Sequence, residues 1–181
     1  AEFGELYALF VMDRRMRATL FRYLALAEGL LKTVATYEFC LSLTQAFKFY
    51  TFQDEATRFA IAQEFQRMHR EARGERARRI THASLQDSYG HMKDFRNICA
   101  HDERLYCARV DKSKSTGLRR LLADMYTVLT PEECGSMASE LMSHIGFAAA
   151  RIHTIGERDV LEAMGFSSRS EIVSVLDGDN H

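Results

Sequence analysis

The sequence predicts an all-α fold: a helical bundle of five to eight helices, in a single domain that spans residues 1–181. Apolar residues recur at spacings of three and four over long stretches, which is typical of amphipathic helices. The chain has one proline and no tryptophan, and 46% of its residues are hydrophobic, as in an ordinary folded domain. The net charge of −1 excludes a general positive field, so a nucleic-acid site must come from local clusters.

The first helix is expected from about Leu6 to Phe39. One apolar stripe runs along it, formed by Leu9, Met16, Leu20, Leu24, Ala27, Leu31 and Val34. Asp13 and Arg17 stand four residues apart, and so do Glu28 and Lys32. Oppositely charged residues at this spacing pair on a helix surface, so we expect both pairs to be solvated at the flank of a core helix.

The segment from Leu41 to Arg73 keeps a helical pattern, with a break predicted at 51–54 and an apolar face that includes Phe59. It leads into a basic stretch in which arginines stand at every third position: Arg67, Arg70, Arg73, Arg76 and Arg79, with Arg78 added. Because this spacing drifts by about 60° per step around a helix, these residues wrap around it and form no single stripe. Two interpretations stay open, a solubilising segment and an RNA-binding set of Arg73, Arg76 and Arg79 that contacts phosphates.

Further helices are predicted at about 85–106, 118–129 and 131–153, with a polar loop at 107–117. Thr130, Pro131 and Glu133 form a capping box with proline at the first helical position. Ser168 and Glu171 repeat the signal before a short final helix.

The helix at 85–106 carries the residues suited to chemistry. Projected at about 100° per residue, it places Phe95 on the core face, and Arg96 and His101 flank the polar face about 140° apart. Histidine can take a proton from an RNA 2′-hydroxyl near neutral pH, and arginine can stabilise charge on the phosphate. The spacing alone is weak evidence, because roughly 0.7 such Arg-x4-His matches arise by chance in this composition.

The stretch from Phe95 to Tyr106 resembles the signature of Abi-like (abortive infection) proteins in the HEPN superfamily, whose catalytic pattern is Arg, four to six residues, then His. Three further stretches are similar to that family: 12–17, 27–32 and 163–166. Relative to the family, the chain lacks an additional N-terminal region and has a short connection between Phe39 and Leu41. We therefore expect a truncated N-terminus, or a numbering that runs across missing residues.

The resemblance implies a dimer in which two Arg-His pairs face each other across a cleft. It implies metal-independent endoribonuclease activity, in phage defence or in a toxin–antitoxin system, with RNA as substrate and an RNA or protein antitoxin as a partner. Arg96 and His101 carry over as catalytic residues and Asn97 as a positioning residue. Arg104, on the same polar face, is expected to bind RNA.

The sequence also predicts roles for two acidic residues. Glu28 either supports the site from the first helix or forms a surface ion pair with Lys32. Asp102 projects onto the apolar face and is interpreted as structural, because an aspartate there needs a partner.

Two other functions are considered. The first is a non-catalytic helical module of the same superfamily that binds RNA or a protein. The second is a metal hydrolase that uses His91, Asp94 and His101, but these ligands follow no recognised metal spacing. Otherwise no metal or cofactor is expected.

The cysteines do not have metal-site spacing and are expected to be small buried thiols; they are Cys40, Cys99, Cys107 and Cys134. The sequence has no signal peptide and no apolar run of membrane-spanning length. We therefore expect a cytoplasmic protein that does not contact a membrane.

Overall fold

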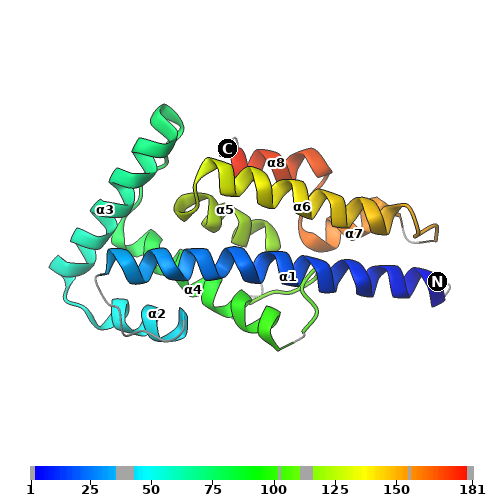
Figure 1. Ribbon diagram of the computed structural model, residues 1–181, viewed down its shortest axis with the longest axis horizontal. Coiled ribbons are helices and arrows are strands. Elements are labelled where there is room, and N and C mark those ends of the chain that lie inside the picture. The colour runs from blue at the N-terminus through cyan, green and yellow to red at the C-terminus, as the bar shows by residue number, and fades with distance from the viewer. Residues whose placement is uncertain (1–2, 36–42, 102, 111–115, 155, 179–181) are drawn as a thin grey trace.

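The computed structural model describes residues 3–35, 43–101, 103–110, 116–154 and 156–178. These residues form eight α-helices, one short 3₁₀ helix and no strand, which confirms the predicted all-α fold (Figure 1). The helices are α1 (Phe3–Val34), α2 (Leu43–Phe52), α3 (Glu55–Arg73), α4 (His82–Ala100), α5 (Leu118–Val128), α6 (Pro131–Ala149), α7 (Glu157–Met164) and α8 (Arg169–Asp177). The 3₁₀ helix, Gly74–Arg76, directly follows α3.

Helix α1 is the longest element, and α6 lies along it (Figure 1). Near the middle of α1, the Glu140 carboxylate of α6 accepts hydrogen bonds from the Thr19 hydroxyl at 3.0 Å and the Tyr23 hydroxyl at 3.3 Å. Near its start, buried Glu5 accepts the backbone N–H groups of His153 and Thr154, just after α6, at 2.6 and 2.7 Å. The two helices therefore run antiparallel.

Helix α4 packs on α1 through Leu85, Tyr89, Met92 and Phe95, which are all buried. They follow one another at spacings of four, three and three, so they form one face of the helix. The Tyr89 hydroxyl donates to the carbonyl of Ala27 at 2.9 Å, which satisfies a polar group inside this contact. The predicted packing of the signature helix against the first long helix is confirmed.

Local signals set several helix boundaries where the sequence predicts them. Thr130 and Glu133 form the expected capping box before α6, and the Ser168 hydroxyl accepts the backbone N–H of Glu171 at the start of α8. The chain breaks between α2 and α3, where the Asp54 carboxylate accepts the N–H of Thr57 at 2.7 Å. Helix α7 is an addition that the sequence analysis does not predict.

The expectation that the cysteines are buried thiols is confirmed only in part. Cys134 is buried and Cys99 half-buried, but Cys107 is exposed, so the expectation of buried thiols is wrong for Cys107. Cys40 and Asp102 lie outside the described residues.

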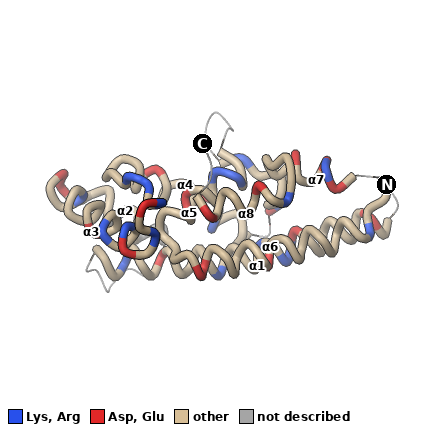
Figure 2. Tube along the Cα trace, turned by 90° about the horizontal axis from the view of Figure 1, so that it is seen from above, with Lys and Arg blue, Asp and Glu red and all other residues tan. Residues whose placement is uncertain are grey.

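No helix in the described part of the chain is long and apolar enough to cross a membrane. Acidic and basic residues are mixed along the whole length of the molecule (Figure 2).

Candidate active site

The end of α4 differs from the sequence prediction. The helix ends at Ala100 and not near Tyr106. His101 is the C-cap residue, with φ −102° and ψ 16°, and its N–H still donates to the Asn97 carbonyl at 2.9 Å. His101 therefore stands at the point where the chain leaves the helix.

A buried carboxylate from α1 explains why the helix stops. Oδ1 of Asp13 accepts the backbone N–H groups of Leu105 and Tyr106, each at 2.9 Å. In a continued helix these groups would donate to the carbonyls of His101 and of the residue after it. Asp13 thus replaces helical acceptors and directs residues 103–106 along α1.

Arg17 completes this arrangement. Its Nε lies 3.3 Å from Oδ2 of Asp13, and both side chains are less than one-tenth exposed. The expectation that this pair is solvated is therefore wrong. Because burial of one such charge alone is strongly unfavourable, the two groups depend on each other.

Three contacts define how α4 lies against α1. Tyr89 reaches Ala27, the guanidinium carbon of Arg96 lies 5.3 Å from the centre of the Phe21 ring, and Leu105 binds Asp13. Numbers on α1 fall as those on α4 rise, so the helices are antiparallel. His101 therefore lies beside the part of α1 between Asp13 and Phe21.

The three predicted catalytic and positioning residues share this end of α4. Arg96 and Asn97 are half-buried and His101 is exposed. His101 follows Arg96 by five positions, a rise of about 7.5 Å along a helix. Among the described residues, neither the Arg96 guanidinium nor the His101 ring has a hydrogen-bond or ion-pair partner. Both groups are thus free to bind an anionic ligand.

The same end carries two further exposed arginines. Arg104 lies beyond the end of α4, so its predicted place on the polar face of that helix is wrong, and its role in RNA binding remains a prediction. Arg14 of α1 lies next to Asp13 and has no partner among the described residues. Arg14 is not selected from the sequence, because its place near this end of α4 depends on the packing of α1 on α4.

The exposed face of α1 beside these residues carries large apolar side chains in addition to Arg14. Phe3, Leu6, Tyr7 and Phe10 are all more than half exposed, and Phe21, the residue that contacts Arg96, is 38% exposed. Their positions fall within about 60° of one line along the helix. We call these five residues the α1 stripe; a patch of this kind on a soluble domain often marks an interaction surface.

Glu28 lies apart from the predicted catalytic pair, Arg96 and His101. Its carboxylate binds the Lys32 ammonium at 2.6 Å, which is the ion pair that the sequence left open as one alternative. Glu28 stands level with Tyr89, about 10 Å along α4 from Arg96. The structure thus favours the ion pair for this residue, and support of the site from Glu28 remains a prediction.

The predicted RNA-binding arginines are not all together. Nη2 of Arg73 donates to the carbonyls of Tyr126 and Leu129 at 3.0 and 2.8 Å, and the guanidinium lies 3.9 Å above the Tyr126 ring. These bonds close the C-terminal end of α5 and give Arg73 a structural role in place of the expected phosphate contact. Arg76 and Arg79 are exposed near the start of α4, and Arg104 lies near its opposite end.

The residues of the alternative metal site are not brought together. Nδ1 of His91 lies 2.8 Å from the buried Asp124 carboxylate, and this hydrogen bond raises the pKa of His91. No group of three or more His, Cys, Asp or Glu side chains in the described residues could hold a metal ion. The metal hydrolase hypothesis based on His91, Asp94 and His101 is therefore wrong.

Comparison with known proteins identifies one family. Residues 39–107 match the family model described as Abi-like protein. The match covers Arg96, Asn97 and His101, and this part of the chain is similar to that family. No curated protein and no solved structure matches the chain.

Proposed function

We propose that the protein is a metal-independent endoribonuclease of the HEPN type. It would act in phage defence by abortive infection or in a toxin–antitoxin system, restrained by an RNA or protein antitoxin. One observation carries the proposal: Arg96, Asn97 and His101 stand at one exposed helix end, inside the segment that matches Abi-like proteins. A non-catalytic RNA- or protein-binding module is the alternative that the experiments below distinguish.

The proposed reaction uses a nucleophile within the substrate. His101 takes the proton from the 2′-hydroxyl, whose oxygen then attacks the adjacent phosphorus. The bond from phosphorus to the 5′-oxygen breaks, and that oxygen takes up a proton from water. Arg96 binds the phosphate oxygens as negative charge develops on them, and Asn97 positions the substrate or His101. The products are a 2′,3′-cyclic phosphate and a 5′-hydroxyl.

The proposal includes a two-fold symmetric dimer. Arg96 and His101 project in directions about 140° apart, so one copy does not readily place both groups on one phosphate. A second copy that covers the α1 stripe would bury Phe10 and Phe21 and bring two sets of these residues together. The contact between Arg96 and Phe21 supports this arrangement, since it joins the stripe to the catalytic pair.

Replacement of Phe10 by glutamate tests the dimer. Phe10 is 56% exposed, so Phe10→Glu is expected to leave the folded protomer within about 0.5 kcal/mol of wild type. A charge in the interface should convert the dimer to a monomer in sedimentation experiments and abolish RNA cleavage. Phe52→Glu, at an exposed position outside the stripe, is the matched control. A monomeric wild-type protein that cleaves RNA would contradict the composite site.

Cleavage of a labelled RNA by single-site variants tests the catalytic pair. His101→Ala should lower the rate by about 10²–10⁴-fold while the protein stays folded, because a general base is lost. Arg96→Ala should be similarly impaired, and Arg96→Lys should recover only part of the rate, since lysine lacks the planar fork of donors. EDTA should have no effect. His153→Ala, which removes another exposed histidine ring, should cleave as wild type.

The outcomes separate the candidate functions. Full activity of His101→Ala would refute the assignment of this residue. RNA binding without cleavage by the wild-type protein would favour the non-catalytic module.

A further inference from the structure

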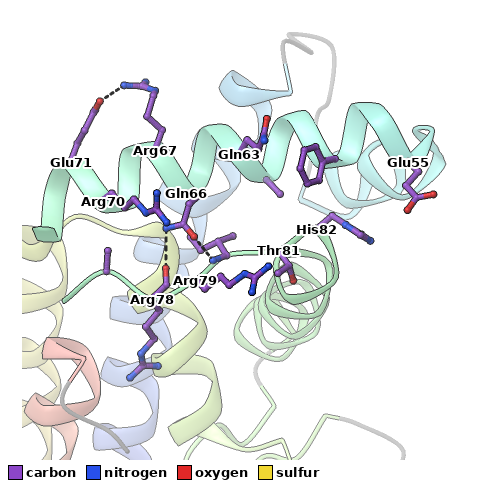
Figure 3. A pocket seen from close by; sticks show the side chains of 14 residues that line it. Glu55, Gln63, Gln66, Arg67, Arg70, Glu71, Arg78, Arg79, Thr81 and His82 are labelled. Carbon is purple, nitrogen blue, oxygen red and sulfur yellow. Dashed lines mark hydrogen bonds and ion pairs between the residues drawn. The ribbon is translucent and has the colours of Figure 1, made fainter. Parts of the chain in front are cut away.

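A groove between α3 and the chain that leads into α4 is separate from the catalytic pair. One wall is a face of α3, and the other is the segment 77–82 (Figure 3). Its volume is about 930 Å³, at the upper end of the range for ligand-binding pockets. We call it the α3 groove.

A single glutamine holds the two walls together. Nε2 of Gln66 donates to the carbonyl of Arg78 at 3.0 Å, and its Oε1 accepts the N–H of Ile80 at 2.6 Å (Figure 3). The Thr81–Ser84 capping box then fixes the point where the segment enters α4. The walls of the groove are therefore set in place without a ligand.

Two free cations line this groove from opposite walls. Arg70 comes from α3 and Arg79 from the extended segment (Figure 3); both are exposed and have no partner among the described residues. Other arginines nearby are engaged. Arg67 binds Glu64 and Glu71, each at 2.5 Å, and Arg78 turns away toward Tyr126 and the Gly178 carbonyl. The free charges are thus concentrated at Arg70 and Arg79.

Apolar side chains also line the groove, and one of them is an open aromatic ring. Ala62 and Ile80 are buried, whereas Phe59 is 53% exposed. The sequence places Phe59 on an apolar face, and in the structure it lines the groove together with His82. A partly exposed ring in the same groove as free guanidinium groups can stack on an unpaired base while the arginines bind phosphates elsewhere along the strand.

We propose that the α3 groove binds single-stranded RNA, with backbone phosphates at Arg70 and Arg79 and a base stacked on Phe59. The open ring of Phe59 favours RNA over an acidic peptide, because an unpaired base can stack on it and an acidic side chain cannot. Glu55 and Glu71 also line the groove, so the phosphates are expected at Arg70 and Arg79 and not along its whole length.

The position of the groove defines its relation to cleavage. His82 and His101 are 19 residues apart along α4, a distance of about 28 Å. Under the proposed function, the groove would hold a part of the RNA that is remote from the cleaved phosphate. Loss of this contact should raise KM and leave kcat unchanged.

Binding of a labelled 12-nucleotide oligouridine, followed by fluorescence anisotropy in the His101→Ala background, tests the groove without need for cleavage. The double variant Arg70→Gln/Arg79→Gln should weaken binding at least about tenfold and reduce the log–log salt slope by about 1.4, as expected for two phosphates on a single strand. Phe59→Ala should weaken it about fivefold or more. The control Arg151→Gln/Arg158→Gln removes two exposed charges outside the groove, and its affinity should match that of the parent protein.

Circular dichroism and thermal unfolding confirm that each variant is folded. An unchanged affinity and salt slope in Arg70→Gln/Arg79→Gln would overturn the groove proposal, as would an equal loss in the control variant. Equal competition by polyglutamate would assign the groove to an acidic peptide. Because every protein in this experiment lacks His101, failure of the groove is distinguishable from failure of the ribonuclease assignment.

Discussion

The two halves of α4 are each held by a buried aspartate, but the two carboxylates bind different parts of the chain. Asp124 of α5 accepts hydrogen bonds from the Ser88 hydroxyl and the His91 ring, both at 2.8 Å. Asp13 of α1 instead accepts two backbone N–H groups beyond the helix end. Asp124 attaches a helix that is already formed, whereas Asp13 determines where the helix stops.

This difference bears on the proposed function, because only the Asp13 end carries Arg96 and His101, the proposed catalytic pair. The path of the chain directly after His101 depends on a residue about 90 positions earlier in the sequence. The first half of α4 is attached by side chains and can lose one of them without a change in the backbone. We therefore expect substitutions of the two aspartates to differ in their effect on activity.

Asp13→Ala is expected to have the largest effect. It removes a buried carboxylate that contacts the Arg17 guanidinium and accepts two backbone N–H groups, so the free energy of unfolding should fall by about 3–5 kcal/mol. Where the variant is still folded, the cleavage rate should fall about 10²-fold because the helix end is displaced. Chemical denaturation and hydrogen exchange of the Leu105 and Tyr106 amides measure the two effects.

Asp87→Ala is the matched control for Asp13→Ala, since this aspartate of α4 is exposed. It should change stability by no more than about 0.5 kcal/mol. Unchanged protection of the Leu105 and Tyr106 amides in Asp13→Ala would refute the role given to Asp13.

Asp124→Ala should have a smaller effect, confined to stability. Ser88 and His91 would lose their acceptor, at a cost of about 1–3 kcal/mol, while Arg120 is more than half exposed and can bind water. The cleavage rate at a temperature where the variant is folded should equal that of wild type. A loss of activity as large as in Asp13→Ala would remove the distinction between the two ends.

The smallest expected effect is a pH dependence of the free energy of unfolding that comes from His91. The hydrogen bond to Asp124 raises the pKa of His91 in the folded protein, so this pair stabilises the fold fully below the unfolded pKa. That stabilisation is lost as pH rises through the raised, folded pKa. In urea denaturation, the free energy of unfolding of the wild type should therefore exceed that of His91→Gln by more at pH 5.5 than at pH 8.5. An equal difference at both pH values would contradict the pairing.

Local signals made much of the fold predictable. Thr130, Pro131 and Glu133 encode the start of α6 within four residues, and Asp54 lies at the predicted break before α3. The end of α4 could not be predicted this way, because its acceptor lies on α1. Helix α7 has only eight residues between two glycines and offers a short apolar pattern.

The sequence predicts which residues form the candidate site, but it does not predict which residues surround them. The Arg96–His101 spacing and the surrounding signature are visible in the sequence. The burial of Asp13 and Arg17, the bonds of Arg73 to α5 and the exposure of Phe59 all depend on contacts between distant segments. Spacing along the chain contains no information about those contacts.

The most direct measurement of the central claim is the chemistry of the RNA ends. An RNA with one cleavage site is incubated with the wild-type protein in EDTA, alongside the same RNA methylated at the 2′-hydroxyl of that site. The account predicts a 2′,3′-cyclic phosphate and a 5′-hydroxyl from the first RNA and no cleavage of the second. A free 3′-hydroxyl with a 5′-phosphate, or cleavage of the methylated RNA, would contradict it.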